Sequence, residues 1–219
     1  MAKARSQFVC QNCGASYPKW VGKCDNCGEW NTLVEQAASV SGNSAVARGA
    51  HSGRVLQPQA MRSINAEDSI ARMSTAIADL DVVLGGGILP GGVVLLAGQP
   101  GIGKSTLLLQ VASSIAASQP VLYASGEESA SQVKLRATRL GADAGDDLAF
   151  IASTSADDIA ATIRSGKYKL VIIDSIQTLS LDEITSAPGT VSQITNSSNV
   201  IIRAAKESGA AVILVGHVT

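Results

Sequence analysis

Aromatic side chains are scarce in this 219-residue chain: only 3% of the residues are Phe, Trp or Tyr, although 46% are hydrophobic. The hydrophobic core must therefore be built from Val, Ile, Leu and Ala. The net charge of −1 excludes a general attraction to nucleic acid, so any such binding requires a local basic surface. No apolar run approaches the roughly 20 residues that span a bilayer, and residues 1–6 lead into no signal-peptide core. These absences predict a cytoplasmic protein with no membrane partner.

Cysteine is absent after Cys27. The four cysteines form two Cys-x2-Cys pairs, and each pair is followed by a glycine that permits a tight turn: Cys10, Cys13, Cys24 and Cys27. Such clustering is typical of a metal site and not of a disulfide framework. The spacing predicts a tetrahedral, structural Zn²⁺ site without an open position, which contributes folding energy to a segment too short to build its own core.

The sequence leaves open whether this zinc module contacts DNA or protein. A basic and aromatic nucleic-acid surface is one interpretation of its remaining side chains: Tyr17, Lys19, Trp20, Lys23 and Trp30. The alternative is that they are the few packing residues of the module, and we favour this interpretation for Trp20 and Trp30.

Composition divides the chain into three segments. Residues 1–36 form the predicted zinc module, and residues 67–219 form a larger domain. Residues 37–66 are rich in Ala, Ser and Gly, contain no acidic residue, and carry three arginines: Arg48, Arg54 and Arg62. We expect this segment to be a flexible tether that decouples the two parts. Its arginines fit ordinary solvation as well as they fit binding of a polyanion.

The larger domain alternates short aliphatic runs with helical stretches. The predicted strands are residues 93–97, 121–125, 148–152, 170–174 and 211–215, and the predicted helices are residues 104–118, 129–140, 156–165 and 191–208. Strands this apolar must be covered on both sides. The pattern therefore predicts an α/β fold with a mostly parallel sheet and helices on both faces.

A phosphate-binding loop follows the first of these strands. Residues 98–105 fit G-x-x-x-x-G-K-[ST], the P-loop pattern. Its lysine places a charge at the β- and γ-phosphates, its serine offers a hydroxyl to Mg²⁺, and the next helix directs its positive N-terminal end to the same anion. The predicted ATP-binding residues are Gly98, Gln99, Pro100, Gly101, Ile102, Gly103, Lys104, Ser105 and Thr106.

Three further segments place candidate functional side chains at the carboxyl edge of the predicted sheet. Asp174 ends a hydrophobic strand in the Walker B pattern, so we expect it to hold Mg²⁺ together with Ser105. Glu127 is our candidate for the group that orients the attacking water, and Glu128 is the second candidate. The alternative is that both acids only supply a favourable negative charge at the N-terminus of the next helix. His217 follows the last strand and either senses the γ-phosphate or only hydrogen-bonds there.

These features together resemble the RadA (Sms) family of bacterial RecA-like DNA repair and recombination proteins. The resemblance covers essentially the whole chain and rests on the zinc knuckles, the arginine-containing linker and five motifs: Leu84-Gly-Gly-Gly-Ile-Leu-Pro-Gly-Gly92, Gly98-Gln-Pro-Gly-Ile-Gly-Lys-Ser-Thr106, Tyr123-Ala-Ser-Gly-Glu-Glu-Ser129, Asp174-Ser-Ile-Gln-Thr178 and Val215-Gly-His-Val218. It implies a RecA-like P-loop core that uses ATP, Mg²⁺ and Zn²⁺, with Lys104, Glu127 and Asp174 as catalytic residues. It also implies a DNA-dependent ATPase that promotes branch migration of recombination intermediates, as a homo-oligomeric ring around single-stranded or branched DNA and alongside a RecA-type recombinase.

The chain departs from this family after the last predicted strand. The Lys-Asn-Arg-Phe-Gly motif, further core strands and a Lon-protease-like domain are not present, so the core of residues 67–219 is expected to be C-terminally incomplete. We therefore expect this chain to bind ATP, to hydrolyse it slowly and to form no stable closed ring. A nucleotide-binding adaptor without significant turnover and a small-molecule kinase are the competing interpretations.

Overall fold

The structure is a computed structural model, and it describes residues 6–11, 15–26, 28–37, 57–63, 71–142 and 147–217. Two sheets lie in this part of the chain, one in the N-terminal module and one in the larger domain. None of the described helices is long and apolar enough to cross a lipid bilayer.

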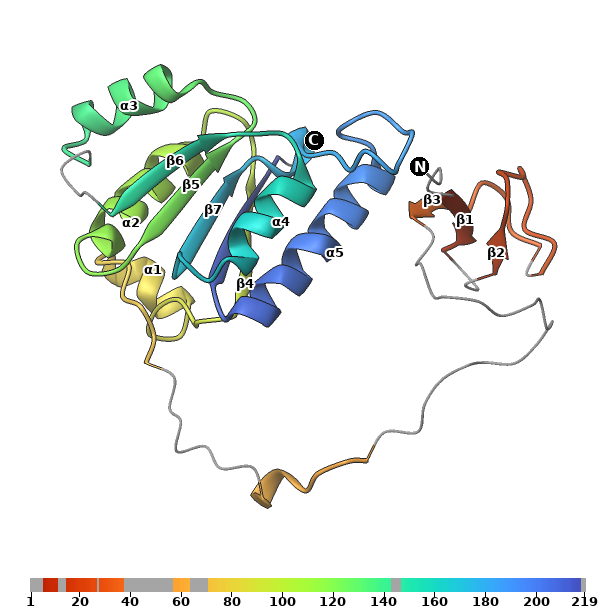
Figure 1. Cartoon of the computed structure of the whole chain (residues 1–219), viewed down its shortest axis with the longest axis horizontal. Helices are drawn as coiled ribbons and strands as arrows, with labels where there is room; N and C mark the ends of the chain where they lie inside the picture. Colours follow the sequence, from red (N-terminus) through yellow and green to blue (C-terminus); the bar gives the residue numbers. More distant parts are fainter. Residues whose placement is uncertain are drawn as a thin grey trace.

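The N-terminal module is a small antiparallel ribbon (Figure 1). Its strands are β1 (Ser6–Cys10), β2 (Ser16–Tyr17) and β3 (Leu33–Ala37), in the order β2-β1-β3. Two buried cysteines and one buried leucine form most of its small core: Cys10, Cys24 and Leu33. A core of this size stabilises little by itself, which agrees with a need for metal.

The larger domain is built on a five-stranded parallel sheet (Figure 1). Its strands are β4 (Val93–Gly98), β5 (Val121–Ser125), β6 (Leu148–Ala152), β7 (Leu170–Asp174) and β8 (Ala211–His217), in the order β4-β8-β7-β5-β6. Every residue of β5 and β7 is buried, as expected for strands that are covered on both faces. The predicted α/β fold is confirmed, and the five predicted strands differ from these bounds by at most two residues.

Helices cover both faces of this sheet. The helices are α1 (Ala78–Val83), α2 (Lys104–Ala116), α3 (Ala130–Arg139), α4 (Ala156–Arg164) and α5 (Val191–Ser208), with the short 3-10 helices η1 (Met61–Ser63) and η2 (Ile176–Thr178). One apolar cluster joins α2 and α3 to the sheet, and a second joins α4 and α5 to the opposite face (Figure 1). Helix α1 and the two 3-10 helices were not predicted, because segments of three to six residues carry too little periodicity.

Side-chain caps mark the N-termini of three of these helices. Helices α4 and α5 begin after Ser155 and Thr190, whose hydroxyls accept hydrogen bonds from Asp158 N and Gln193 N. A capping box of Ser129 and Gln132 starts α3. The turn just before α3 contains Glu127 and Glu128, which line the site described below.

The ribbon contacts the core directly through Glu35 on β3. Its carboxylate accepts from Thr185 Oγ1, which lies 3.1 Å from both of its oxygens, and the side chain is 9% exposed. The backbone carbonyl of Glu35 accepts hydrogen bonds from Ser192 Oγ and Asn196 Nδ2 at the start of α5. These contacts join the ribbon to the core through β3, while the decoupling role of the tether stays a prediction.

Most of the predicted tether, including Arg48 and Arg54, lies outside the described residues. Arg62 lies in η1 and is exposed. The structure describes two parts of the predicted tether, namely residue 37, which ends β3, and residues 57–63.

Glu35→Ala should release the ribbon from the core. The substitution removes the charged acceptor of the Thr185 hydroxyl, a loss of about 1–3 kcal/mol. Both tryptophans of the chain, Trp20 and Trp30, lie in the ribbon, so time-resolved tryptophan anisotropy reports its tumbling alone. We expect the rotational correlation time to fall from that of the whole chain towards that of a small module.

Ser192→Ala tests the same contact from the core side and leaves the ribbon sequence intact. Glu183→Ala is the matched control, because Glu183 is an exposed glutamate in the same loop as Thr185. Fast tumbling in the unsubstituted protein, or equal release by Glu183→Ala, would contradict the contact.

Candidate functional site: a nucleotide pocket at the carboxyl edge of the sheet

The P-loop joins β4 to α2. Gly101 and Gly103 have φ angles of 80° and 101°, a region that side-chain-bearing residues rarely adopt, and Gly103 is the N-cap of α2. The requirement for glycine at these two positions agrees with the prediction. At Gly98 the backbone is ordinary, and an added methyl group would meet only normal van der Waals contacts with Ile102 and Lys104 at 3.6 Å.

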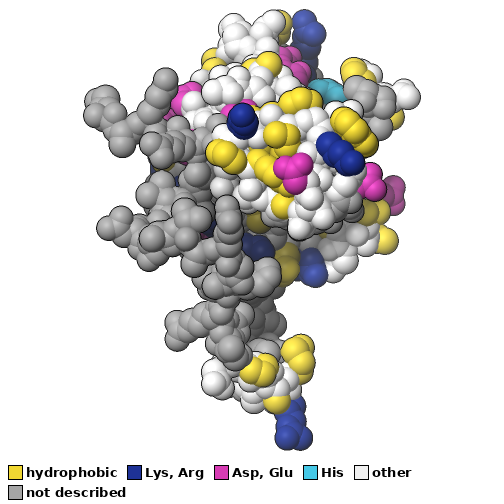
Figure 2. All heavy atoms as spheres, turned by 90° about the vertical axis from the view of Figure 1, so that its right-hand side faces the viewer, with side chains coloured by type: hydrophobic (Ala, Val, Ile, Leu, Met, Phe, Trp, Pro, Cys, Tyr) yellow, Lys and Arg dark blue, Asp and Glu magenta, His cyan; other side chains and the backbone are white. Residues whose placement is uncertain are grey.

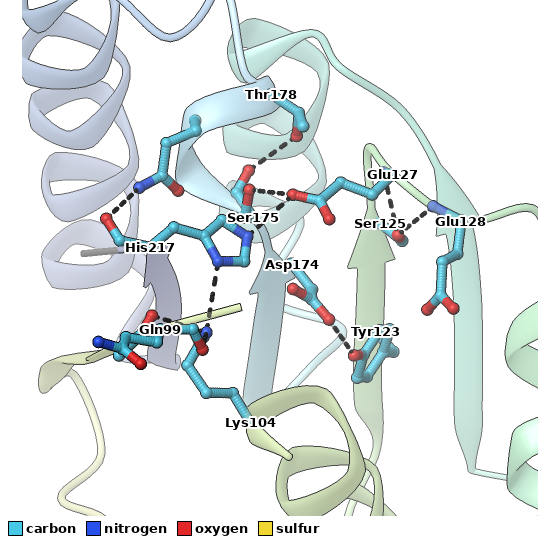
Figure 3. A network of polar contacts seen from close by, with 12 residues as sticks. Gln99, Lys104, Tyr123, Ser125, Glu127, Glu128, Asp174, Ser175, Thr178 and His217 are labelled. Carbon is cyan, nitrogen blue, oxygen red and sulfur yellow. Dashed lines mark hydrogen bonds and ion pairs between the residues drawn. The ribbon is translucent and has the colours of Figure 1, made fainter. Parts of the chain in front are cut away.

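The ammonium group of Lys104 is buried under the P-loop. It donates to the carbonyl oxygens of Gly98 and Gln99, each at 2.9 Å, and lies 3.3 Å from Nδ1 of His217 (Figure 3). Because an ammonium group only donates, Nδ1 must accept and the proton of a neutral imidazole then resides on Nε2. His217 is thus held as a defined tautomer by Lys104.

Glu127 is held by two donors at the opposite side of His217. Its Oε1 accepts from Ser175 Oγ at 2.6 Å and lies 3.2 Å from Nε2 of His217 (Figure 3). Residue 126 must be glycine, because an added Cβ would lie 2.2 Å from Oγ1 of Thr178. The sequence prediction included Glu127 and His217 but missed Ser175, which gives no signal apart from its place after Asp174.

Glu128 points away from this network and pairs with an arginine on α3. Its two carboxylate oxygens contact the two terminal nitrogens of Arg136 at 2.6 and 2.9 Å, which is bidentate geometry. The two adjacent acids therefore have different partners. Arg136 was not assigned a place from the sequence, and its contact with Glu128 spans eight residues and a helix start.

Asp174 ends the central strand β7 and is almost fully buried. The hydroxyl of Tyr123 on β5 donates to its Oδ2 at 2.6 Å. Burial, followed by the charge of Asp174, raises the pKa of Tyr123 well above its usual value, so the phenol stays protonated and always donates. Tyr123 was part of a quoted motif, but the sequence gave no reason to pair it with Asp174.

These side chains meet in one cavity of about 340 Å³. It is lined by Pro100, Gly101, Gly103, Lys104, Ser105, Thr106, Glu127, Glu128, Arg136, Asp174 and His217. Of the predicted P-loop residues, Gly98 and Gln99 contribute backbone oxygens to Lys104, and Ile102 is 71% exposed. A cavity with a buried lysine, a helix N-terminus and three carboxylates fits a polyphosphate with a divalent cation.

The ribbon presents part of a metal site. Cys10 and Cys24 are both buried, and each begins a turn closed by the same type of backbone hydrogen bond. Cys10 N donates to Ala15 O, and Cys24 N donates to Glu29 O, both at 2.9 Å. Gly28 has a φ of 76°, as a tight knuckle requires. Two matching turns that bury soft sulfur atoms fit a tetrahedral zinc ion. The other two predicted ligands, Cys13 and Cys27, lie outside the described residues.

Comparisons with known proteins agree with this geometry. A family described as an AAA domain matches residues 59–219, and a rubredoxin metal binding domain matches residues 8–35. The chain therefore belongs to the AAA-domain family of P-loop proteins, with a zinc-ribbon-type module before the core.

Within that class, the chain is similar over its whole length to DNA repair proteins named RadA. It is 47% identical to RadA of Brucella abortus, 44% to that of Pseudomonas aeruginosa and 42% to that of Escherichia coli, in each case over 100% of this chain and 48% of the relative. The resemblance drawn from the motifs is confirmed. The chain spans about half the length of the curated relatives it matches.

A solved structure supports the fold. The core resembles a DnaB-like replicative helicase whose structure was described with its primase interactions, with a TM-score of 0.58 and 18% identity. The match covers 68% of this chain and 45% of the helicase chain. At this identity the likeness concerns the arrangement of helices and strands alone.

Tyr123→Phe should weaken the dependence of nucleotide binding on Mg²⁺. The substitution keeps the ring but leaves a buried oxygen of Asp174 without its donor, a cost of about 1–3 kcal/mol. We expect Asp174 to hold its position less well, so that more Mg²⁺ is needed for half-maximal binding of a fluorescent ATP analogue. Tyr168→Phe is the matched control, and an equal shift in both variants would contradict the positioning role.

Proposed function

We propose that this chain is the nucleotide-binding half of a DNA-dependent ATPase that acts in recombinational DNA repair and promotes branch migration. The observation that carries the proposal is the pocket in which Lys104, His217 and Glu127 form one connected line between the P-loop and Ser175. The similarity to proteins named for DNA repair supplies the biological context.

The proposed roles follow from what each side chain contacts. Lys104 is the group that meets the β- and γ-phosphates, and it must exchange the carbonyl oxygens of Gly98 and Gln99 for phosphate oxygens. The Ser105 hydroxyl and the Asp174 carboxylate are the residues that would hold Mg²⁺, which neutralises the charge of the phosphates when bound.

Glu127 is the proposed group that orients the attacking water. Its Oε1 is engaged by Ser175 and His217, so its Oε2 is the oxygen that can accept from water. The neighbouring Glu128 is unsuited to this role, because both of its carboxylate oxygens are engaged by Arg136. His217 lies between Lys104 and Glu127 and contacts both side chains, which supports a γ-phosphate-sensing role.

Glu127→Gln should trap bound ATP. The amide keeps the size of the side chain but cannot accept a proton from water, so we expect turnover to fall by about 10²–10⁴-fold while nucleotide binding persists. Single-turnover hydrolysis and filter binding of radiolabelled ATP separate the two effects. Glu128→Gln is the matched control, and a stronger loss in that variant would reverse the assignment.

Turnover of ATP with and without single-stranded DNA tests the proposed function. A DNA-dependent ATPase should hydrolyse faster with DNA, whereas a small-molecule kinase should respond to a metabolite and an adaptor should release no phosphate above that of Lys104→Ala. Turnover that ignores DNA in both this chain and a version with the length of the curated relatives would refute the DNA dependence.

The assembly and partners proposed here belong to the longer protein. RecA-type sites are completed between neighbouring subunits, which favours a homo-oligomeric ring on single-stranded or branched DNA beside a RecA-type recombinase in the cytoplasm. We infer that this chain alone binds ATP, hydrolyses it slowly and forms no closed ring, which light scattering with ATP tests. The proposed zinc stoichiometry is one ion per chain, bound by Cys10, Cys13, Cys24 and Cys27, and elemental analysis measures it.

A further inference from the structure

Both tryptophans of the chain are exposed on the ribbon, although we favoured a packing role for them. The side chains of Trp20 and Trp30 are 53% and 67% exposed. They lie on either side of Gly22, where an added methyl group would be 3.6 Å from the Trp20 ring and 3.9 Å from the Trp30 ring. The packing interpretation is therefore wrong for these two side chains, since the buried core of the ribbon consists of Cys10, Cys24 and Leu33. Instead, the two rings form an open aromatic surface.

Lysine side chains border this surface. Lys23 lies opposite Trp30 in an isolated antiparallel bridge, and its ammonium group is 5.7 Å from the centre of the Trp30 ring. Lys19 precedes Trp20 and is also exposed. Figure 2, viewed from the ribbon side, shows hydrophobic side chains on this face with both Lys or Arg and Asp or Glu side chains next to them.

The distribution of charge along the sequence favours an anionic partner here and not on the core. Residues 1–66 contain seven Lys and Arg against three Asp and Glu, whereas residues 67–219 contain ten against fifteen. One of the three acids, Glu35, is buried against Thr185 and α5, whereas Asp25 and Glu29 are exposed on the ribbon together with Lys19 and Lys23. The excess of basic residues in the N-terminal part and of acidic residues in the core favours an anionic partner on the N-terminal part.

We propose that Trp20 and Trp30 form a stacking platform for the bases of a single nucleic-acid strand, with Lys19 and Lys23 facing its phosphates. Exposed aromatic rings beside lysines suit unpaired bases, which have free faces, while a duplex keeps its bases stacked inside. Lysine is depleted in the cores of protein–protein interfaces, which favours a nucleic-acid strand over a protein on this surface. This inference rests on the proposed DNA dependence and names the surface that carries it.

Fluorescence of the two indoles tests the platform directly, with the zinc-loaded chain and no ATP. A single-stranded oligodeoxythymidylate should quench the tryptophan emission, and a duplex of equal length should quench it much less. Binding of the labelled oligonucleotide should weaken about tenfold or more in Trp20→Ala and in Trp30→Ala, since stacking on one aromatic ring contributes about that factor. Trp30→Phe should retain most of the affinity, because a phenyl ring still stacks.

Lys167→Ala is the matched control for Lys23→Ala, because Lys167 lies 5.3 Å from the ring of Tyr168 in a similar pair on the acidic core. We expect Lys23→Ala alone to weaken binding and to reduce its salt dependence. Zinc content measured for each variant verifies that the ribbon is folded.

Unchanged emission with single-stranded DNA, or equal quenching by duplex, would overturn the platform and leave the surface to a protein. The result is separable from that of the proposed function. DNA-stimulated turnover that persists in the tryptophan variants refutes the platform alone, whereas quenching without any DNA-stimulated turnover refutes the ATPase proposal alone.

Discussion

The parallel register of the central sheet is the constraint on which the site depends. Pairing places Gly98 of β4 beside His217 of β8, and Ser125 of β5 beside Asp174 of β7. Four strand ends therefore stop in one row, and the P-loop, the Glu127 turn and the Walker B carboxylate need only short extensions to meet. A shift of one residue in any of these strands would reverse its side chains and remove its contribution.

Each acidic side chain that lines the pocket has a different protein partner. Glu128 pairs with Arg136, Glu127 is engaged by Ser175 and His217, and Asp174 accepts from the Tyr123 phenol. Each of the three carboxylates that line the pocket therefore has its own protein partner. Together with Lys104 they form a polar pocket that fits a polyphosphate with a divalent cation.

Local sequence patterns predicted the fold and the loop but not the pairings within the site. The strands were visible because five aliphatic runs, such as residues 170–174, are too apolar to face water, and the P-loop was visible because its glycines and lysine have fixed spacing. The contacts of Tyr123 with Asp174 and of Ser175 with Glu127 join residues about fifty positions apart. Composition and periodicity carry no signal for such pairs.

The same limit applies to the N-terminal module. The composition of residues 37–66 predicts a flexible tether, but it carries no signal for the contact that Glu35 makes with α5 across more than 150 residues of sequence. Tryptophan is highly buried on average, yet Trp20 and Trp30 are exposed on a ribbon whose small buried core consists of Cys10, Cys24 and Leu33. Through Glu35, the same ribbon contacts Thr185 and the start of α5. The more basic N-terminal part and the more acidic core are thus joined by a direct contact, which a flexible tether alone does not provide.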